Sequence, residues 1–428
     1  MLRGVRWPRR AGDQHQQSSG APAYTGVVDP GTSSLRFLVA ELTGPQATVW
    51  GWDEGRGCGA TDTQRLLVTC QEILARAEAM AGRRADHWSP ADHLAVGLPP
   101  SQLLGRSWTV TQKRLQPARP VEERELEILL GRTLRLAINQ LRRVAPSAKQ
   151  SRDSEPGAPQ PDDSEWVLVD AAIVDLTVDG HRVTDPVGFR AQEIGAAVFA
   201  ALARRETIET WRIVAQQLEF STLTLTASSL ALAAALRDQH GVLLDVGGDA
   251  TDLTLWQSGC PVALGSVPAG GDALTRLLAH TWDLSFEDAE RLKCAYASGL
   301  LTEEDHTRVL EAMFPALREW LEETETALAR LNQDRPLPQR LYLLGGGSVL
   351  PEMVEAARAL AWSERIHFER YPQVARLRPT DIPGVVNRTD LGRGPGDVSA
   401  LALAAWAGQQ YQPPDRPARI LSELCQRF

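Results

Sequence analysis

The sequence has few cysteines and no long apolar run. Five cysteines are scattered through 428 residues, and no two of them form a Cys-x-x-Cys pair. This pattern argues against a disulfide framework or a structural zinc site, and it indicates a reducing compartment. No window holds 18 consecutive apolar residues, which argues against an ordinary membrane-spanning helix. The arginine-rich start lacks the apolar segment of a signal peptide, so we expect residues 1–23 to be a disordered basic tail.

An excess of positive charge is also missing. The formal net charge is −9 at pH 7, and we therefore expect no nucleic-acid partner. Apolar residues are plentiful, at 43% of the chain. A chain of this length and composition can bury more than one core, so we expect two or more domains.

Residues 241–256 combine two apolar runs with a glycine turn between them. The first run ends at Asp245, and Gly247 and Gly248 follow before the second, alternating run. This pattern predicts two strands joined by a tight turn. Glycine amides in such a turn can surround a polyphosphate, while the aspartate positions a hydrated Mg²⁺. The alternative is an ordinary hairpin with a glycine-rich turn.

Two further stretches favour the phosphate-binding interpretation. Residues 24–42 repeat the pattern, with an apolar strand, Asp29, Gly31, the hydroxyls of residues 32–34 and a second strand. The two copies predict two facing phosphate loops. Residues 341–350 form a strand that runs into three glycines before a helix opened by Pro351. A base or ribose can lie flat against such bare backbone.

The order of the three motifs resembles the phosphate-1, phosphate-2 and adenosine motifs of the superfamily that contains actin, sugar kinases and heat-shock chaperones. The resemblance implies an α/β, actin-like two-lobed ATPase fold with duplicated cores that close on ATP and Mg²⁺. It assigns the catalytic role to Asp29 and Asp245, which hold the metal through water. The resemblance also implies that Glu290 and Lys293 contact the ribose and the edge of the adenine. The alternative for these two residues is an ion pair on a solvated helix face. The nucleotide contacts that the resemblance implies come from Gly31, Thr32, Ser33, Ser34, Gly247, Gly248, Thr251, Gly270, Gly271, Glu290, Lys293, Gly345, Gly346, Gly347 and Ser348.

A narrower resemblance connects the chain to the FtsA cell-division proteins. It rests on residues 55–82 with the strand and prolines after them, and on the segment around the turn Asp-Pro-Val-Gly-Phe at 185–189. The resemblance implies an α+β insert at residues 99–205, a domain that actin lacks and that contacts neighbouring subunits in this family. Within it we predict strands at 107–111, 166–174 and 175–183 and helices at 121–144 and 192–204. The Pro-, Ser- and acid-rich residues 146–165 are expected to be a mobile loop.

The remaining chain divides between the lobes and a C-terminal segment. We assign residues 24–98, 206–240 and 351–411 to the first lobe and 241–350 to the second. Residues 412–428 are a linker and an amphipathic segment, whose apolar face is accompanied by Arg419 and Arg427. The FtsA resemblance implies that this segment anchors the protein to anionic lipid. The alternative is a final helix docked on the core or on a partner.

Three residues depart from the FtsA-type loops. Ser34 stands where those loops usually carry lysine, and strand alternation argues against Arg36 as a substitute. Asp249 and Ala250 stand where the second loop usually has glycine and threonine. A carboxylate beside a triphosphate is repulsive. We therefore expect nucleotide binding with slow or absent hydrolysis.

The functional expectation follows from the resemblance. It implies an ATP-binding protein on the inner face of the cytoplasmic membrane, which self-associates into filaments and tethers the tubulin-like protein FtsZ. The first alternative is a scaffold for type IV pili like the related PilM. The second is a small-molecule kinase, which needs a general base, and in the second lobe the sequence offers only Asp249 or Asp252 for that role.

Overall fold

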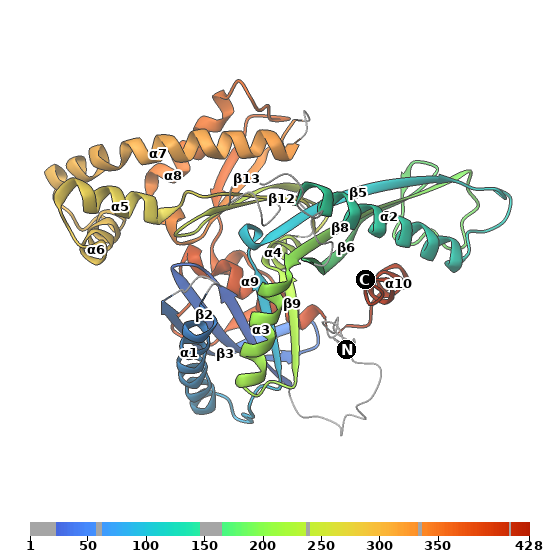
Figure 1. The fold of residues 1–428 in the computed structure, drawn as a ribbon, viewed down its shortest axis with the longest axis horizontal. Coiled ribbons are helices and arrows are strands. Elements are labelled where there is room, and N and C mark those ends of the chain that lie inside the picture. Colours follow the sequence, from blue (N-terminus) through green and yellow to red (C-terminus); the bar gives the residue numbers. More distant parts are fainter. Residues whose placement is uncertain (1–22, 57–61, 146–164, 237–239, 333–335, 411) are drawn as a thin grey trace, which may run out of the picture.

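The computed structural model describes residues 23–56, 62–145, 165–236, 240–332, 336–410 and 412–428. The predictions of a disordered tail and a mobile loop fall almost entirely on residues 1–22 and 146–164, which lie outside the described residues. Figure 1 shows two lobes, one above the other, with a third unit built around α2 (Glu123–Val144) projecting to one side.

The first lobe is built on a six-stranded sheet in the order β15-β3-β2-β1-β4-β9. Helices α1 (Thr63–Arg84) and α3 (Arg205–Gln217) pack on one face, and α4 (Ser228–Ala235) and α9 (Val398–Gln409) pack on the other. Both faces are covered because the strands are apolar on both sides. The strands are β1 (Ala23–Pro30), β2 (Ser34–Thr43), β3 (Gln46–Arg56), β4 (His93–Leu98), β9 (Thr222–Ala227) and β15 (Val385–Asn387).

The second lobe and the insert share one nine-stranded sheet, in the order β14-β13-β10-β11-β12-β5-β8-β6-β7. The two units meet where β12 pairs with β5 through Ala263 and Arg106. The strands are β5 (Leu103–Lys113), β6 (Trp166–Val178), β7 (His181–Arg182), β8 (Glu193–Arg204), β10 (His240–Val246), β11 (Thr251–Gln257), β12 (Cys260–Val267), β13 (Arg340–Leu344) and β14 (Gln373–Arg376).

Helices complete the second lobe, and short 3-10 turns connect elements in both lobes. A core around Trp320 joins the long helix α7 to β10, β11 and β13. The helices are α5 (Gly271–Trp282), α6 (Phe286–Ala297), α7 (Glu303–Asn332) and α8 (Pro351–Ala359). Because α8 and β14 belong to the second lobe, the assignment of residues 351–411 to the first lobe holds only from β15 onward. The 3-10 turns are η1 (Pro100–Gln102), η2 (Gly346–Val349), η3 (Leu360–Trp362), η4 (Pro379–Asp381) and η5 (Pro395–Asp397).

The predicted elements of the insert differ from the structure in two places. The helix expected at 192–204 is the strand β8, and the two strands expected at 166–183 are mostly the single strand β6. The alanine-rich sequence of β8 favours a helix locally. However, β8 is paired on both edges, with β5 and β6, and Ile194, Val198 and Phe199 are fully buried. Tertiary pairing and burial therefore override local propensity.

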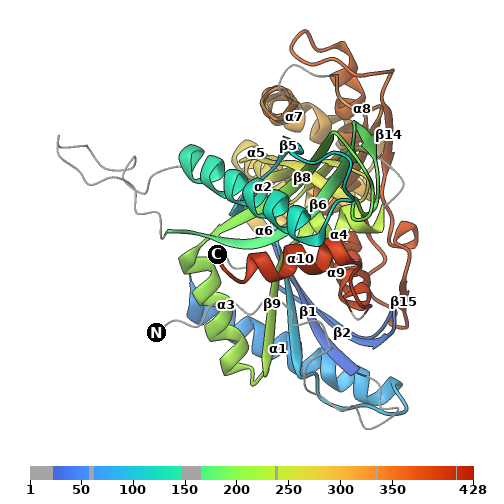
Figure 2. The same cartoon turned by 90° about the vertical axis from the view of Figure 1, so that its right-hand side faces the viewer.

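The C-terminal helix α10 (Arg416–Cys425) is docked on the insert (Figure 2). Ile420, Leu421, Leu424 and Cys425 are buried in one core with α2 and β6. The apolar face predicted to meet a membrane is therefore covered by protein, which corrects the expectation of an exposed anchor and matches the docked-helix alternative. In the described part of the chain, we find no helix long and apolar enough to cross a bilayer.

Ion pairs reinforce this docking. Arg419 contacts Glu123 at the start of α2 at 2.7 Å, and Arg416 contacts Asp185 at 2.8 Å. Arg427 reaches Glu127 at 3.1 Å. The arginines expected to meet anionic headgroups thus face carboxylates of the insert.

Candidate functional site

The two predicted phosphate loops face each other across the junction of the lobes. We call residues 29–34 the first phosphate loop and residues 245–251 the second. The Asp249 amide donates to Thr32 Oγ1 at 3.3 Å, and Ser33 Oγ donates to the Asp272 carboxylate at 3.3 Å. A Cβ on Gly248 would collide with Ser33 Oγ. The loops are therefore in direct contact, and the glycine is needed for their close approach.

Strand register shows how the two hairpins are related. On β1 and β2, Asp29 lies directly opposite Arg36, and on β10 and β11, Asp245 lies directly opposite Asp252. The aspartates and their partners have the same spacing in both hairpins. The duplication thus extends to individual positions, and the first lobe has a cation where the second has a carboxylate.

This register corrects one sequence argument. Side chains two residues apart on a strand lie on the same face, so alternation does not separate Arg36 from the position of Ser34. Arg36 faces the cluster that contains Asp29. Ser34 itself is used locally, because its hydroxyl donates to Glu54 at 3.2 Å.

Arg36 is surrounded by carboxylates from three elements. Its Nε donates to Asp397 Oδ1 at 2.8 Å, its Nη1 lies 3.7 Å from Asp29 Oδ2, and its Nε lies 3.8 Å from Glu54 Oε2. The side chains of Arg36, Asp29 and Asp397 are only 14%, 14% and 15% exposed. Shielding from solvent strengthens the attraction between these charges, but burial also costs each charge part of its hydration.

The aspartates of both hairpins have raised pKa values, so their charged forms are disfavoured. Burial raises the pKa of Asp29 to about 7, although Arg36 opposes the shift. Burial, with the nearby charge of Asp245, raises the pKa of Asp252 to about 7. The Oδ1 atom of Asp252 is buried without a hydrogen-bond partner among the described residues. Burial also raises the pKa of Asp245, which accepts from Ser399 Oγ at 3.1 Å.

These contacts do not fit the predicted magnesium site. A hydrated Mg²⁺ between the loops needs Asp29 and Asp245 as acceptors for its water shell. Asp29 is instead paired with Arg36, whose positive charge repels a metal ion at that position. In the described ranges, no group of three or more His, Cys, Asp or Glu side chains could hold a metal ion.

A second glycine turn, formed by Gly270 and Gly271, is packed onto the second phosphate loop. The amides of Gly271 and Asp272 donate to the carbonyls of Gly247 and Gly248 at 2.8 and 2.9 Å. A Cβ on Gly270 would collide with both of those carbonyls. The first amides of α5, which the resemblance aims at the nucleotide, are thus used to fix the loop.

Asp249 has a partner that the sequence analysis missed. Arg276 of α5 lies one turn beyond Asp272, and its Nη2 donates to Asp249 Oδ1 at 2.9 Å. The carboxylate is therefore turned toward a cation at the edge of the loop. Arg276 follows Asp272 by four residues, which is one turn of the helix that begins at the second glycine turn. This spacing is the sequence feature from which Arg276 could have been predicted.

Glu290 and Lys293 form an ion pair, but not on a solvated face. Lys293 Nζ lies 2.7 Å from Glu290 Oε2 and is buried beneath the second glycine turn. It also donates to the Gly271 carbonyl at 3.0 Å and to Thr275 Oγ1 at 2.8 Å. The pair therefore ties α6 to the start of α5.

The triple-glycine motif, residues 345–348, offers open backbone at one position. Gly345 has φ +84°, and a Cβ there would collide with Asp245 Oδ1. Gly347 is also tight, because its Cβ would lie 2.6 Å from Val246 Cγ1. At Gly346, by contrast, a Cβ would meet nothing within 4 Å. Ser348 is fully buried and donates to the Gly345 carbonyl at 2.7 Å, so it shapes the turn.

Thr251 does not face the loops. Its hydroxyl donates to the Ala269 carbonyl at 2.7 Å and accepts from Trp320 Nε1 at 2.8 Å. The residue is fully buried, on the opposite side of β11 from Asp252. We therefore leave Thr251 out of the proposed site, which corrects its predicted role as a phosphate ligand.

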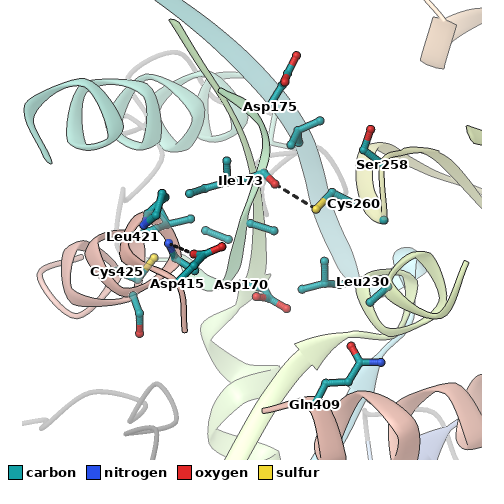
Figure 3. Close-up of a pocket in the computed structure, with 18 of the residues that line it drawn as sticks. Asp170, Ile173, Asp175, Leu230, Ser258, Cys260, Gln409, Asp415, Leu421 and Cys425 are labelled. Atoms are coloured by element: carbon teal, nitrogen blue, oxygen red, sulfur yellow. Dashed lines mark hydrogen bonds between the residues drawn. The ribbon is translucent and has the colours of Figure 1, made fainter. Parts of the chain in front are cut away.

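A separate cavity of about 580 Å³ lies between α10, the insert and the first lobe (Figure 3). Asp170, Cys260 and Leu421 line it, and Cys260 Sγ donates to the Ile173 carbonyl at 3.2 Å. Burial raises the pKa of Asp170 to about 6 and that of Cys260 to about 12, so this thiol is a poor nucleophile. None of the predicted nucleotide residues lines this cavity.

Comparisons with known proteins agree with this architecture. Residues 242–387 match the family model of cell division protein FtsA. The chain is 27% identical over 287 residues to cell division protein FtsA of Rhizobium meliloti, covering 55% of this chain and 64% of that protein. It is 24% identical over 221 residues to the Helicobacter pylori protein of the same name, covering 46% of this chain and 44% of that protein. The chain thus matches less than two thirds of the length of either relative.

A solved structure titled PilM-PilN type IV pilus biogenesis complex has the same overall fold, with a TM-score of 0.60 and 18% identity, covering 92% of this chain and 99% of that one. The predicted fold class is confirmed. This chain has the actin-like ATPase fold, and its resemblance to the FtsA proteins is confirmed over residues 242–387.

Proposed function

We propose that this chain is an FtsA-like cell-division protein that binds an adenine nucleotide between its two lobes. The observation that carries the proposal is the pair of in-register Asp–Gly hairpins, whose loops face each other beside a triple-glycine turn. The match of residues 242–387 to the FtsA family model supports the cell-division role.

The loops provide the groups that phosphates need. In the proposal, the hydroxyls of Thr32 and Ser33 and the backbone of Gly31, Gly247 and Gly248 bind the phosphates once their present contacts open. The backbone beside Gly346 receives the nucleoside. Nucleotide entry therefore requires the two loops to separate, because Thr32 and Ser33 now contact the second lobe.

Hydrolysis is proposed to be slow or absent. A reaction at the terminal phosphate needs charge stabilisation and a positioned water. Asp29 is paired with Arg36, and Asp249 with Arg276, so neither carboxylate is free to orient a water. The kinase alternative gains no support either, since Asp249 is paired and Asp252 is held by Ser101 at 3.3 Å.

The partners in the proposal are those of the FtsA proteins, namely an FtsZ-like tubulin homologue, further copies of this chain and the inner face of the cytoplasmic membrane. The PilM-like scaffold is the alternative, and the likeness in fold supports it equally. Membrane contact through α10 requires that helix to leave α2. Gly131 of α2 faces Leu424, so Gly131→Phe is expected to displace α10 and to increase flotation with anionic vesicles. Unchanged flotation would count against this route.

Gly346 offers a direct test of nucleotide binding. A leucine at this position projects into open space, so we expect Gly346→Leu to fold normally and to block the nucleoside. Titration calorimetry with ATP should show binding to the wild type and a loss of at least about tenfold in the variant. The control is Gly180→Asn, at the remote β6–β7 turn, where space is also open and φ is +79°. Equal affinity in wild type and Gly346→Leu would refute the proposed site.

A further inference from the structure

The guanidinium of Arg36 lies in the part of the cleft where the fold leads one to expect a divalent cation. Asp29 and Asp245 stand at equivalent positions of the two hairpins, and in the expected arrangement they share the water shell of a metal ion. Arg36 is directly across the strands from Asp29 and contacts it at 3.7 Å. A cation is thus already built into the first lobe.

The chain around Arg36 holds it in this place. Its Nε donates to Asp397 at 2.8 Å, and Asp397 is fixed in turn because it accepts from the Gly394 amide at 2.8 Å. Asp397 directly precedes α9, and that helix also provides Ser399, whose hydroxyl donates to Asp245 at 3.1 Å. One helix start therefore connects Arg36 with the aspartate of the opposite lobe.

The turn that holds Arg36 also touches the triple-glycine motif. The Pro395 carbonyl accepts from the Gly345 amide at 3.1 Å. A Cβ on Gly396 would lie 2.9 Å from Arg36 Nη2 and 3.3 Å from the Gly346 amide. The guanidinium thus lies close to both the first phosphate loop and the backbone proposed to receive the nucleoside.

The charges around Asp29 favour Arg36 over a divalent ion as the cation at this position. Arg36 is set mainly against the charge of Asp397, because burial raises the pKa of Asp29 to about 7, and all three side chains are shielded from solvent. A divalent ion added beside Asp29 would be repelled by the guanidinium and would lose the carboxylate that the arginine already uses. Guanidinium groups bind phosphate oxygens well and need no metal to do so.

We propose that Arg36 takes the place of the divalent cation in this cleft, so that the chain binds adenine nucleotides without Mg²⁺. The inference rests on the proposed nucleotide-binding function and assigns the counter-charge of that site. Arg36 is a binding residue in this account.

The first test uses the wild-type full chain. Calorimetric titration with ADP and with ATP is carried out once in excess Mg²⁺ and once in EDTA. We expect the two dissociation constants to agree within about threefold for each nucleotide. A loss of about tenfold or more in EDTA would overturn the inference and leave the proposed function standing. Absence of binding in both buffers would refute the proposed function, and the inference with it.

Variants of Arg36 then test whether this residue supplies the counter-charge. Arg36→Met removes the charge and keeps most of the side-chain length, so we expect binding in EDTA to weaken by about tenfold or more and Mg²⁺ to restore part of it. Arg36→Lys keeps the charge and should retain binding in EDTA. The control is Arg76→Met, which removes an arginine paired with Asp53 on the outer side of the same lobe. If Arg36→Met binds as tightly as the wild type in EDTA, Arg36 is not the counter-charge.

Discussion

Asp252 shows how the duplicated hairpins place charge in the interior. It faces Asp245 across β10 and β11, and one of its oxygens is buried without a partner among the described residues. Burial is the main reason why the charged form of Asp252 is unfavourable, and the nearby charge of Asp245 adds repulsion. The raised pKa of Asp252, about 7, is the expected consequence.

Folding stability should therefore depend on pH through Asp252. Between pH 4 and 7 the folded protein retains a proton that the unfolded chain has lost, so this residue makes stability fall as pH rises through that window. We predict that Asp252→Asn stabilises the protein at pH 8 by about 1–3 kcal/mol and has little effect at pH 4, where the unfolded chain also keeps much of this proton. The check is the urea midpoint at both pH values.

A matched control is Asp283→Asn. Asp283 is exposed at φ +51°, a conformation that asparagine also adopts readily. It should leave the pH dependence as it is. A wild-type midpoint that rises steadily from pH 5 to 8, unaffected by Asp252→Asn, would contradict the account.

Asp249 and Arg276 form an ion pair at the edge of the second phosphate loop. Because each neutralises the other, the pair adds little net charge to the second phosphate loop. Replacing Asp249 by glycine and Ala250 by threonine frees the guanidinium of Arg276 and restores a hydroxyl. We predict that this double variant binds ATP about tenfold more tightly, since one charged hydrogen bond is worth about 1.5–3 kcal/mol. Calorimetry gives the affinity, and phosphate release gives the turnover.

Arg276→Ala provides the matching control for that variant. Added to the double variant, it should abolish the gain in affinity, because the gain is assigned to the released arginine. If the gain persists without Arg276, relief of repulsion from Asp249 is the whole effect. A wild-type chain with a normal ATPase rate would contradict the proposal of slow turnover.

At the scale of elements, α10 illustrates how an amphipathic segment acquires its role from what it meets. Its apolar stripe satisfies the sequence criteria for a membrane anchor, yet α2 and β6 offer a complementary apolar surface. Burial of these side chains stabilises the insert by the hydrophobic effect, and the exposed ion pairs add much less.

Truncating the stripe should therefore cost more than changing the polar face. We predict that Leu424→Ala destabilises the chain by about 2–4 kcal/mol, since the side chain is 6% exposed and packs over Gly131. Gln426→Ala, on the exposed side, should change stability by less than about 0.5 kcal/mol. Urea denaturation compares the two. Equal effects would mean that α10 is not docked in solution.

Elements also show where sequence reasoning ends. The strands of the two hairpins, β1 with β2 and β10 with β11, and the insert helix α2 follow from the hydrophobic pattern of the sequence. The strand β8 does not, because its alanines carry no periodic signal and its state is decided by pairing with β5 and β6. The insert and the second lobe share one sheet, joined through Ala263 and Arg106. This pairing cannot be predicted from the local sequence either, because it depends on how distant strands come together.

At the scale of the whole molecule, motif order was sufficient for the fold, but not for the site. The three glycine motifs predict two lobes around a cleft, and the overall fold agrees. The pairing of Arg36 with Asp397 joins residues 361 positions apart, and the turning of Thr251 into the core depends on Trp320. Such contacts depend on tertiary placement, which a local pattern does not encode.

Around the loops the lobes meet through polar contacts, whereas a buried apolar core of α4, α9, β10, β11 and β13 joins them elsewhere. Ser33 reaches Asp272, and Arg56 of β3 pairs with Glu287 of α6 at 3.1 Å, with both side chains exposed. Exposed pairs of this kind contribute little to stability. The arrangement therefore suits loops that open and close around a ligand while the apolar core keeps the lobes joined.

Nucleotide binding between the two lobes is tested most directly by hydrogen exchange of the full chain with and without ATP, read out by mass spectrometry. We predict protection at three separate stretches, residues 29–34, 245–251 and 345–349, because the nucleotide contacts both loops and the triple-glycine motif at once. No change there, or protection confined to the residues around the cavity beneath α10, would contradict it.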